Sequence, residues 1–176
     1  MKKKVSSPGF KLMGLAFNIR DFISPRINVL NEVGIKPGKT VLDYGCGPGS
    51  YILPLSSLTG SSGEIYALDL HPLAIQSVQK IALKNKLENV KTIHSSCDTG
   101  LPDQTVDIVL LYDTYHDIEN PDDVLQEISR ILKADGIFSF SDHHMGDREI
   151  REKILSNNLF KLIKKNRKTY TFSKYF

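Results

Sequence analysis

The chain has little of what marks a secreted or membrane-embedded protein. Only two of its 176 residues are cysteines, Cys46 and Cys97, so it does not depend on a disulfide framework, and we expect a cytoplasmic location. No apolar run approaches the roughly 20 residues that span a bilayer. The basic start is not followed by the apolar stretch of a signal peptide. The sequence therefore predicts neither secretion nor membrane insertion.

Net charge is also small. At +3 it gives no reason to expect a polyanionic partner. Basic residues do cluster near the C-terminus: Lys161, Lys164, Lys165, Arg167 and Lys168. Such a run is usually a solvated face. We therefore do not expect contact with nucleic acid, and an RNA-binding role for this segment stays an alternative.

The length fits a single hydrophobic core. We expect an N-terminal tail and short helical cap over residues 1–34, and one globular domain over residues 35–176. Apolar residues recur at helical spacing in two parts of the cap: Leu12, Leu15, Ala16 and Ile19, then Ile27, Leu30 and Val33. Gly34 is expected to end the second helix.

From Thr40 onward, short apolar strands alternate with amphipathic helices. The expected strands are 40–44, 64–69, 89–94, 106–112 and 136–141. Pro72 opens one helix, and another has Asn120 as its N-cap and Lys133 in its last turn. This alternation predicts a parallel sheet covered on both faces. Residues 159–163 and 168–172 predict a closing antiparallel hairpin.

A glycine-rich turn follows the first strand, in the run Asp43-Tyr44-Gly45-Cys46-Gly47-Pro48-Gly49. Glycines at this point let the backbone bend sharply and let a ligand approach the main chain. A dinucleotide would want its third glycine one residue later, where Ser50 stands. Asp43 would repel a pyrophosphate but suit the ammonium group of an amino-acid-like ligand. The pattern favours a cationic nucleoside over a nicotinamide cofactor; a plain tight turn is the other interpretation.

Two more acidic residues follow later strands. Asp69 ends the second strand about 20 residues after the last glycine, where a carboxylate can bind both hydroxyls of a ribose. It could equally cap the helix that Pro72 opens. Asp98 follows the third strand, next to Cys97, where it could accept a hydrogen bond from an adenine amino group or lie in a surface loop.

On these residues the chain resembles the class I S-adenosylmethionine-dependent methyltransferases, in the branch of ubiquinone and menaquinone biosynthesis (domain type 11 or 25). The likeness runs from about Val33 to Asp142 and is strongest in 41–49, 101–109 and 124–136, although Ala134-Asp135 replaces the usual Pro-Gly. It implies a doubly wound, Rossmann-like α/β fold. The implied sheet has seven strands in the order 3-2-1-4-5-7-6, mostly parallel, with strand 7 antiparallel.

The resemblance also implies S-adenosyl-L-methionine as cofactor and S-adenosyl-L-homocysteine as product. The implied cofactor-binding residues are Asp43, Tyr44, Gly45, Cys46, Gly47, Gly49, Asp69, Leu70, Cys97, Asp98 and Tyr112. Asp43 and the glycine turn would lie near the methionine moiety, Asp69 on the ribose and Asp98 near the adenine. We expect the N-terminal helices to cover this pocket with Phe17, Asn18, Arg20 and Phe22.

Catalytic candidates should follow the fourth and fifth strands, because open α/β sheets bind ligands at the carboxyl ends of their strands. We predict His116, Asp113 and His143, with His116 as a general base if the acceptor carries a proton of high pKa. The other interpretation of His116 is a pocket-wall histidine hydrogen-bonded to the main chain. Asp113, Asp142 and His143 also offer ligands for a divalent metal, but we predict catalysis without one.

The sequence thus predicts an S-adenosylmethionine-dependent methyltransferase. No Asn/Asp-Pro-Pro-Tyr/Phe run follows the fourth strand. Members of the family that methylate base nitrogens or glutamine amides carry this motif there, so the resemblance argues against those acceptors. Few residues remain for a substrate domain, so we expect a small-molecule acceptor, or one reached through the second subunit of a homodimer. The alternatives are an RNA methyltransferase that uses the basic hairpin, a non-catalytic cofactor-binding module and, last, a nicotinamide dehydrogenase.

Overall fold

Strands β1 (Thr40–Tyr44) and β4 (Val106–Tyr112) form the centre of a seven-stranded sheet. The computed structural model describes residues 9, 14, 20, 21 and 23–175. β4 is buried along its whole length, as expected of a parallel strand covered on both faces. Its parallel register with β1, in which Tyr44 lies opposite Leu111, brings the ends of both strands to the same edge.

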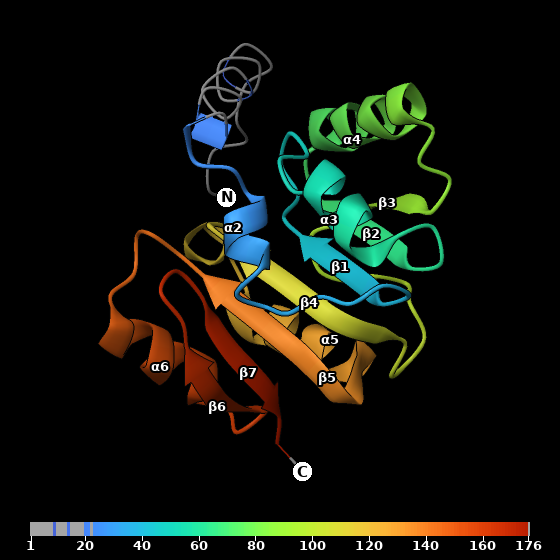
Figure 1. Ribbon diagram of the computed structural model, residues 1–176. Helices are drawn as coiled ribbons and strands as arrows, with labels where there is room; N and C mark the ends of the chain where they lie inside the picture. The colour runs from blue at the N-terminus through green and yellow to red at the C-terminus, as the bar shows by residue number, and fades with distance from the viewer. Residues whose placement is uncertain (1–8, 10–13, 15–19, 22, 176) are drawn as a thin grey trace.

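The remaining strands complete the order β3-β2-β1-β4-β5-β7-β6 (Figure 1). They are β2 (Glu64–Asp69), β3 (Val90–His94), β5 (Leu132–Ser141), β6 (Phe160–Lys165) and β7 (Tyr170–Lys174). β7 pairs antiparallel with both β5 and β6, whereas the pairs from β3 through β5 are parallel. The predicted sheet order and the antiparallel strand 7 are therefore confirmed.

The fifth strand begins four residues before its predicted start. Leu132 pairs with Val106 and is fully buried, so the chain passes straight from helix into strand. Lys133 was predicted in the last turn of the helix, but it lies in β5. Its ammonium group binds Asp107 Oδ2 at 3.0 Å. The hairpin strands are also shifted by one or two residues and end at Lys165 and Lys174.

Helices cover both faces of the sheet, as predicted. They are α2 (Ile27–Leu30), α3 (Ile52–Thr59), α4 (Pro72–Asn85), α5 (Pro121–Ile131) and α6 (Asp147–Leu155), with a 3-10 turn η1 (Tyr115–Asp117). One hydrophobic cluster joins α2, α3 and α4 to Ile108 and Leu110 of β4. The other joins α5 and α6 to Val109 and Leu111 of the same strand. Alternate residues of β4 therefore serve opposite cores.

The predicted cap is present in part. α2 ends at Leu30, and turns lead to Gly34, whose φ of +75° suits a residue without Cβ. Glu32, in these turns, accepts hydrogen bonds from Lys168 N, Thr169 N and Thr169 Oγ1. This contact ties the cap to the turn between β6 and β7. The first predicted cap helix, with its residues Leu12, Leu15, Ala16 and Ile19, lies outside the described residues.

Asn120 immediately precedes α5, as predicted, but its side chain makes no capping hydrogen bond. Asp122 and Asp123 in the first turn instead complement the positive end of the helix. Within the described part of the chain, no helix combines the length and the apolar character needed to cross a membrane.

Candidate functional site

The glycine turn after β1 is anchored to β2 and packed from two sides. Gly45 N and Cys46 N both donate to Leu68 O, at 2.8 and 3.0 Å. All three glycines of the turn have positive φ. A Cβ on Gly45 would overlap the side chain of Thr114, and one on Gly49 would lie 2.8 Å from Ile81 Cδ1. The turn therefore needs glycine at both positions for close packing, and Thr114 brings the segment after β4 against it.

Gly47 differs from these two, because a Cβ added there would meet no atom within 4 Å. Its N–H donates to Asp69 Oδ2 at 2.9 Å, which fixes the turn without filling the space above it. A tight turn alone does not require this opening. The space suits a ligand that contacts the main chain of the turn.

Asp43 is the strongest electrostatic feature of this turn. Its side chain is buried, and Oδ2 has no hydrogen-bond partner among the described residues. Burial raises the pKa of this carboxyl to about 7, and repulsion from Asp69 adds to the effect. A buried carboxylate without a partner is costly. Its chemistry fits the ammonium group of a bound ligand, which would supply the missing partner.

Asp69 is held in place at the end of β2. Oδ1 accepts from His71 N at 2.7 Å, and Oδ2 accepts from Gly47 N. Burial raises its pKa, and these two hydrogen bonds offset the rise only in part. The side-chain cap of α4 is His71, whose Nδ1 accepts from Leu73 N. Asp69 therefore does not serve as the side-chain cap of α4. Each of its carboxylate oxygens can still accept a hydrogen bond from a diol.

The other predicted cofactor residues lie in contrasting surroundings. Leu70 is 51% exposed although it is apolar, and Cys97 is partly buried. Asp98 is exposed, and its Oδ1 accepts from Gly100 N in a local turn. Tyr44 and Tyr112 are buried: the Tyr44 hydroxyl donates to Ser96 O, and that of Tyr112 pairs with Ser139 Oγ at 2.7 Å. Both tyrosines support the walls of the site through the core.

The N-terminal segment reaches the glycine turn through Arg20, whose Nη2 donates to Ser50 Oγ at 3.2 Å. Burial raises the pKa of the adjacent Tyr51 to about 12, although a hydrogen bond from Arg26 opposes the rise. The predicted covering residues Phe17, Asn18 and Phe22 lie outside the described residues.

His116 and Asp142 meet where β4 and β5 end. His116 Nδ1 lies 2.8 Å from Asp142 Oδ2, and its main-chain N donates to the same oxygen. Burial would raise the pKa of Asp142, but the bonds from His116 and from His144 N outweigh it, so the pKa lies below its usual value. An ionised carboxylate only accepts, so Nδ1 carries the proton and Nε2 is the basic nitrogen. Nε2 lies 3.4 Å from the exposed Asp117.

Asp113 and His143 form a second pair beside the first. Asp113 has φ of +51°, and its Oδ1 lies 2.8 Å from His143 Nδ1. The ring of His144 lies between the two other imidazoles, 4.1 Å from that of His116 and 4.0 Å from that of His143. The three predicted catalytic residues are therefore brought together. Asp113, Asp142 and His143 also place ligand atoms within 4.8 Å of one another, the reach of a metal site.

The partner of His116 is the feature that the sequence did not indicate. The sequence singled out Asp142 only as an acid next to two histidines that offers a ligand for a divalent metal, although catalysis without a metal was predicted. The predicted pocket-wall histidine would bond to the main chain, whereas the ring of His116 bonds to a buried carboxylate. Thr114, which packs against Gly45, was also missed, because no sequence pattern relates the two positions.

Comparison with known proteins shows a consistent relationship. The chain matches the model of a family described as "Methyltransferase domain" over residues 35–174. A demethylmenaquinone methyltransferase of Geobacillus sp. (strain WCH70) is 28% identical over 125 residues, 70% of this chain and 53% of the relative. A ribosomal protein L11 methyltransferase of Paraburkholderia xenovorans is 32% identical over 88 residues, 49% and 29% of the two chains. The chain spans about half the length, or less, of these curated relatives.

Among solved structures, an S-adenosylmethionine-dependent methyltransferase from Aquifex aeolicus superposes with a TM-score of 0.76 at 26% identity. The alignment covers 92% of this chain and 96% of the other. This superposition supports a Rossmann-like methyltransferase fold for nearly the whole chain. The chain therefore belongs to the methyltransferase domain family, and its resemblance to the class I S-adenosylmethionine-dependent methyltransferases is confirmed.

Proposed function

We propose that this protein transfers the methyl group of S-adenosylmethionine to a small-molecule acceptor. The observation that carries the proposal is that one turn combines two features. Asp43 has a buried carboxylate oxygen without a partner among the described residues, and the space above Gly47 is open. S-adenosylmethionine has an ammonium group for the first and needs main-chain approach at the second. A nicotinamide dinucleotide would place a pyrophosphate there and be repelled.

The residues present fit this cofactor at each end. Asp43 would hold the ammonium group, and the carboxylate of Asp69, anchored by two main-chain N–H groups, would accept from the ribose hydroxyls. The exposed apolar side chain of Leu70 would lie against the adenine. Cys97 and Asp98 remain our proposal for the adenine edge.

When bound, S-adenosylmethionine supplies a methyl group already activated by its sulfonium, so the chain has to orient the acceptor more than to activate it. For an acceptor with a hydroxyl group, His116 Nε2 would take the proton. Asp142 would hold the imidazole in the required tautomer and balance the charge that forms on it. We assign Asp113 and His143 to the wall of the same site, because their side chains bond to each other.

A small acceptor is supported by the names of the relatives that the chain matches. The relatives that match it over about half their length include several demethylmenaquinone methyltransferases, whose names denote a quinone acceptor. We propose an acceptor of comparable chemistry, a small ring with an acidic proton, bound either by one chain or across a homodimer.

Calorimetry with S-adenosylhomocysteine and NAD tests the cofactor, and labelled S-adenosylmethionine with a panel of phenols, quinol precursors, thiols and transcripts tests the transfer. We expect micromolar binding of S-adenosylhomocysteine and none of NAD. Asp69→Ala should weaken that binding by about 1.5–3 kcal/mol, as for lost hydrogen bonds to a charged group. Asp135→Ala, which changes an exposed residue of β5, should leave the binding unchanged. Binding without turnover on any acceptor would favour a non-catalytic module, and labelled transcripts an RNA methyltransferase.

A further inference from the structure

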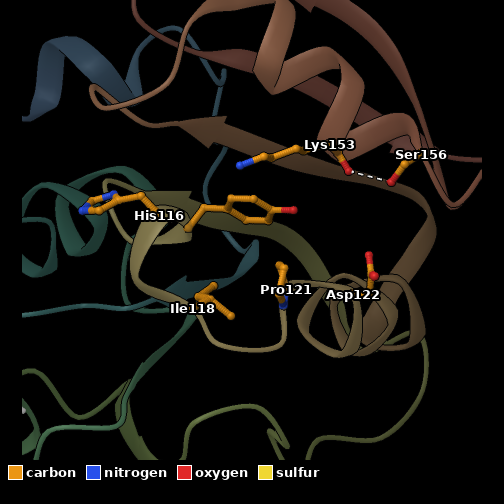
Figure 2. Close-up of a pocket in the computed structure, with 7 residues that line it drawn as sticks. His116, Ile118, Pro121, Asp122, Lys153 and Ser156 are labelled. Atoms are coloured by element: carbon orange, nitrogen blue, oxygen red, sulfur yellow. Dashed lines mark hydrogen bonds between the residues drawn. The ribbon is translucent and has the colours of Figure 1, made fainter. Parts of the chain in front are cut away.

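A groove of about 340 Å³ opens beside His116, outside the cofactor-binding turn. One wall consists of η1 and the first residues of α5, with Tyr115, Ile118 and Pro121, and the other of α6, with Lys153. Figure 2 shows Ile118 and Pro121 facing Lys153 across the groove, with His116 at one end. None of the predicted cofactor residues lines it.

Tyr115 closes the groove on the side of the core. Tyr115 is 5% exposed, and its ring packs edge-on against Phe140 in the core, with 5.5 Å between ring centroids. Burial, followed by the charge of Asp122, raises the pKa of Tyr115 to about 12, so its hydroxyl stays protonated at neutral pH. This hydroxyl makes no hydrogen bond with another described residue. Ile118 and Pro121, which are partly exposed, offer an apolar surface that suits an aromatic ligand.

Lys153 gives the groove a charge. Its side chain extends from α6 along the groove in the direction of His116, and Asp122 lies toward the other end (Figure 2). Its Nζ pairs with Glu149 Oε1 at 2.8 Å, and both side chains are about half-exposed. Such an exposed pair contributes little, and an ammonium group has three donors. Lys153 can therefore bind a ligand anion as well, whereas Asp122 repels one from the far end.

We propose that this groove is the acceptor subsite and that it takes a small hydroxyaromatic acid. The ring would lie on Ile118 and Pro121, the carboxylate at Lys153 and the hydroxyl at His116. The inference rests on the proposed function, because it assigns the groove to the acceptor of that methyl transfer. His116 is the one residue that belongs both to the groove and to the cluster at the ends of β4 and β5.

The transfer balances with groups already described. The acceptor oxygen forms a bond to the methyl carbon as the carbon–sulfur bond breaks, and the electron pair of that bond stays on sulfur. The hydroxyl proton passes to Nε2 of His116, and the resulting imidazolium is held by the Asp142 carboxylate. Water then removes the proton. No oxidant, reductant or further reactant is needed.

The test uses two probes that differ only in the carboxylate, 3,4-dihydroxybenzoate and catechol. Each is titrated into the full chain saturated with S-adenosylhomocysteine, and binding is followed by amide shifts in NMR spectra. The expected result is shifts at Tyr115, Ile118 and Lys153, with 3,4-dihydroxybenzoate bound about ten-fold more tightly than catechol, as for one charge-assisted contact. Lys153→Met should abolish this preference. Lys80→Met, which changes an exposed lysine of α4, should keep it.

Four results would overturn the inference while leaving the proposed function intact. They are equal affinity of the two probes in the unchanged protein, shifts confined to other residues, no shift at millimolar probe, and a preference that survives Lys153→Met. Failure of the proposed cofactor is visible beforehand, because S-adenosylhomocysteine would then not bind and the saturated protein could not be prepared. Failure of the methyl transfer alone is visible in the assay with labelled S-adenosylmethionine, which is independent of the probe titration.

Discussion

His116 Nδ1 and Asp142 Oδ2 lie 2.8 Å apart, and the Asp142 side chain is wholly excluded from solvent. The same carboxylate accepts from the main-chain N of His116 and from that of His144. Three donors therefore fix its orientation, and it in turn fixes the ring of His116. Paired titratable groups of this kind are typical of functional sites, although structural ion pairs also form them.

Asp142→Asn should release this ring. An amide can present its NH₂ group to Nδ1 and favour the tautomer with the proton on Nε2, the wrong one for a base. We expect a fall in kcat of about ten- to a hundred-fold, with the KM for S-adenosylmethionine unchanged. Nitrogen chemical shifts of His116 measure the tautomer without any acceptor. Asp117→Asn, which changes the exposed acid near Nε2, is the control; an unchanged tautomer in Asp142→Asn would contradict the assignment.

The binding of S-adenosylmethionine should tighten as the pH rises through neutrality. In the empty site the pKa of Asp43 is about 7. A bound ammonium group favours the ionised carboxylate and lowers its pKa, so binding releases a proton below pH 7. Between pH 6 and pH 8 the Kd should fall about ten-fold by linkage. Calorimetry at both values measures this, and Asp43→Asn should bind weakly at both; equal affinity in the unchanged protein would refute the role of Asp43.

The same residue predicts a conflict between stability and binding. A carboxyl whose pKa is raised from 3.8 to about 7 on folding destabilises the empty protein as the pH rises between these two values, and the full penalty is present above pH 7. Asp43→Asn should therefore stabilise the cofactor-free protein at pH 8 by about 1–3 kcal/mol, while binding is lost. Thermal unfolding at pH 4 and pH 8 tests this, with the gain confined to the higher pH. Asp135→Asn, which changes an exposed residue of β5, should change neither the stability nor the binding.

The sequence predicted the strands and the glycine turn because both depend on local patterns: apolar runs, breakers and an acid at a strand end. The sheet order was implied by the family resemblance and not by these patterns. The pairing of His116 with Asp142 depends also on the backbone conformation of the turn after β4. Tyr112 lies opposite Ser141, so the residues that follow each strand are neighbours, but the directions of their side chains depend on the turn that begins at Asp113, where φ is +51°. No residue pattern reports that value.

The contact of Glu32 with Thr169 could not be predicted from the sequence for a similar reason. These residues are 137 positions apart, and the contact exists only because the hairpin folds back beside α2. Propensity does not encode such a pairing. The start of β5 was missed because Leu132 suits both a helix and a strand, and its burial against Val106 decides between them.

Two substitutions in the glycine turn should separate folding from binding. Gly45→Ala places a methyl group against Thr114 at a positive φ, so it should lower the free energy of unfolding by about 1–3 kcal/mol. Gly47→Ala meets no atom, so it should cost less stability but obstruct the cofactor. Thermal unfolding and S-adenosylhomocysteine calorimetry measure the two effects. The reverse pattern, with Gly47→Ala binding normally, would show that the ligand does not approach the turn there.

Thorough chelation should leave methyl transfer unchanged, although Asp113, Asp142 and His143 could reach one metal ion. Both oxygens of Asp142 already accept main-chain N–H groups, and Asp113 Oδ1 accepts from His143 N and lies 2.8 Å from its Nδ1. A metal would have to displace the His143 contact and compete with the bonds that hold His116. Initial rates before and after treatment with a chelator, with and without added Mg²⁺ and Zn²⁺, measure the dependence. A rate that falls on chelation and returns with one ion would assign the cluster to a metal, and His116 would then lose its role as the base.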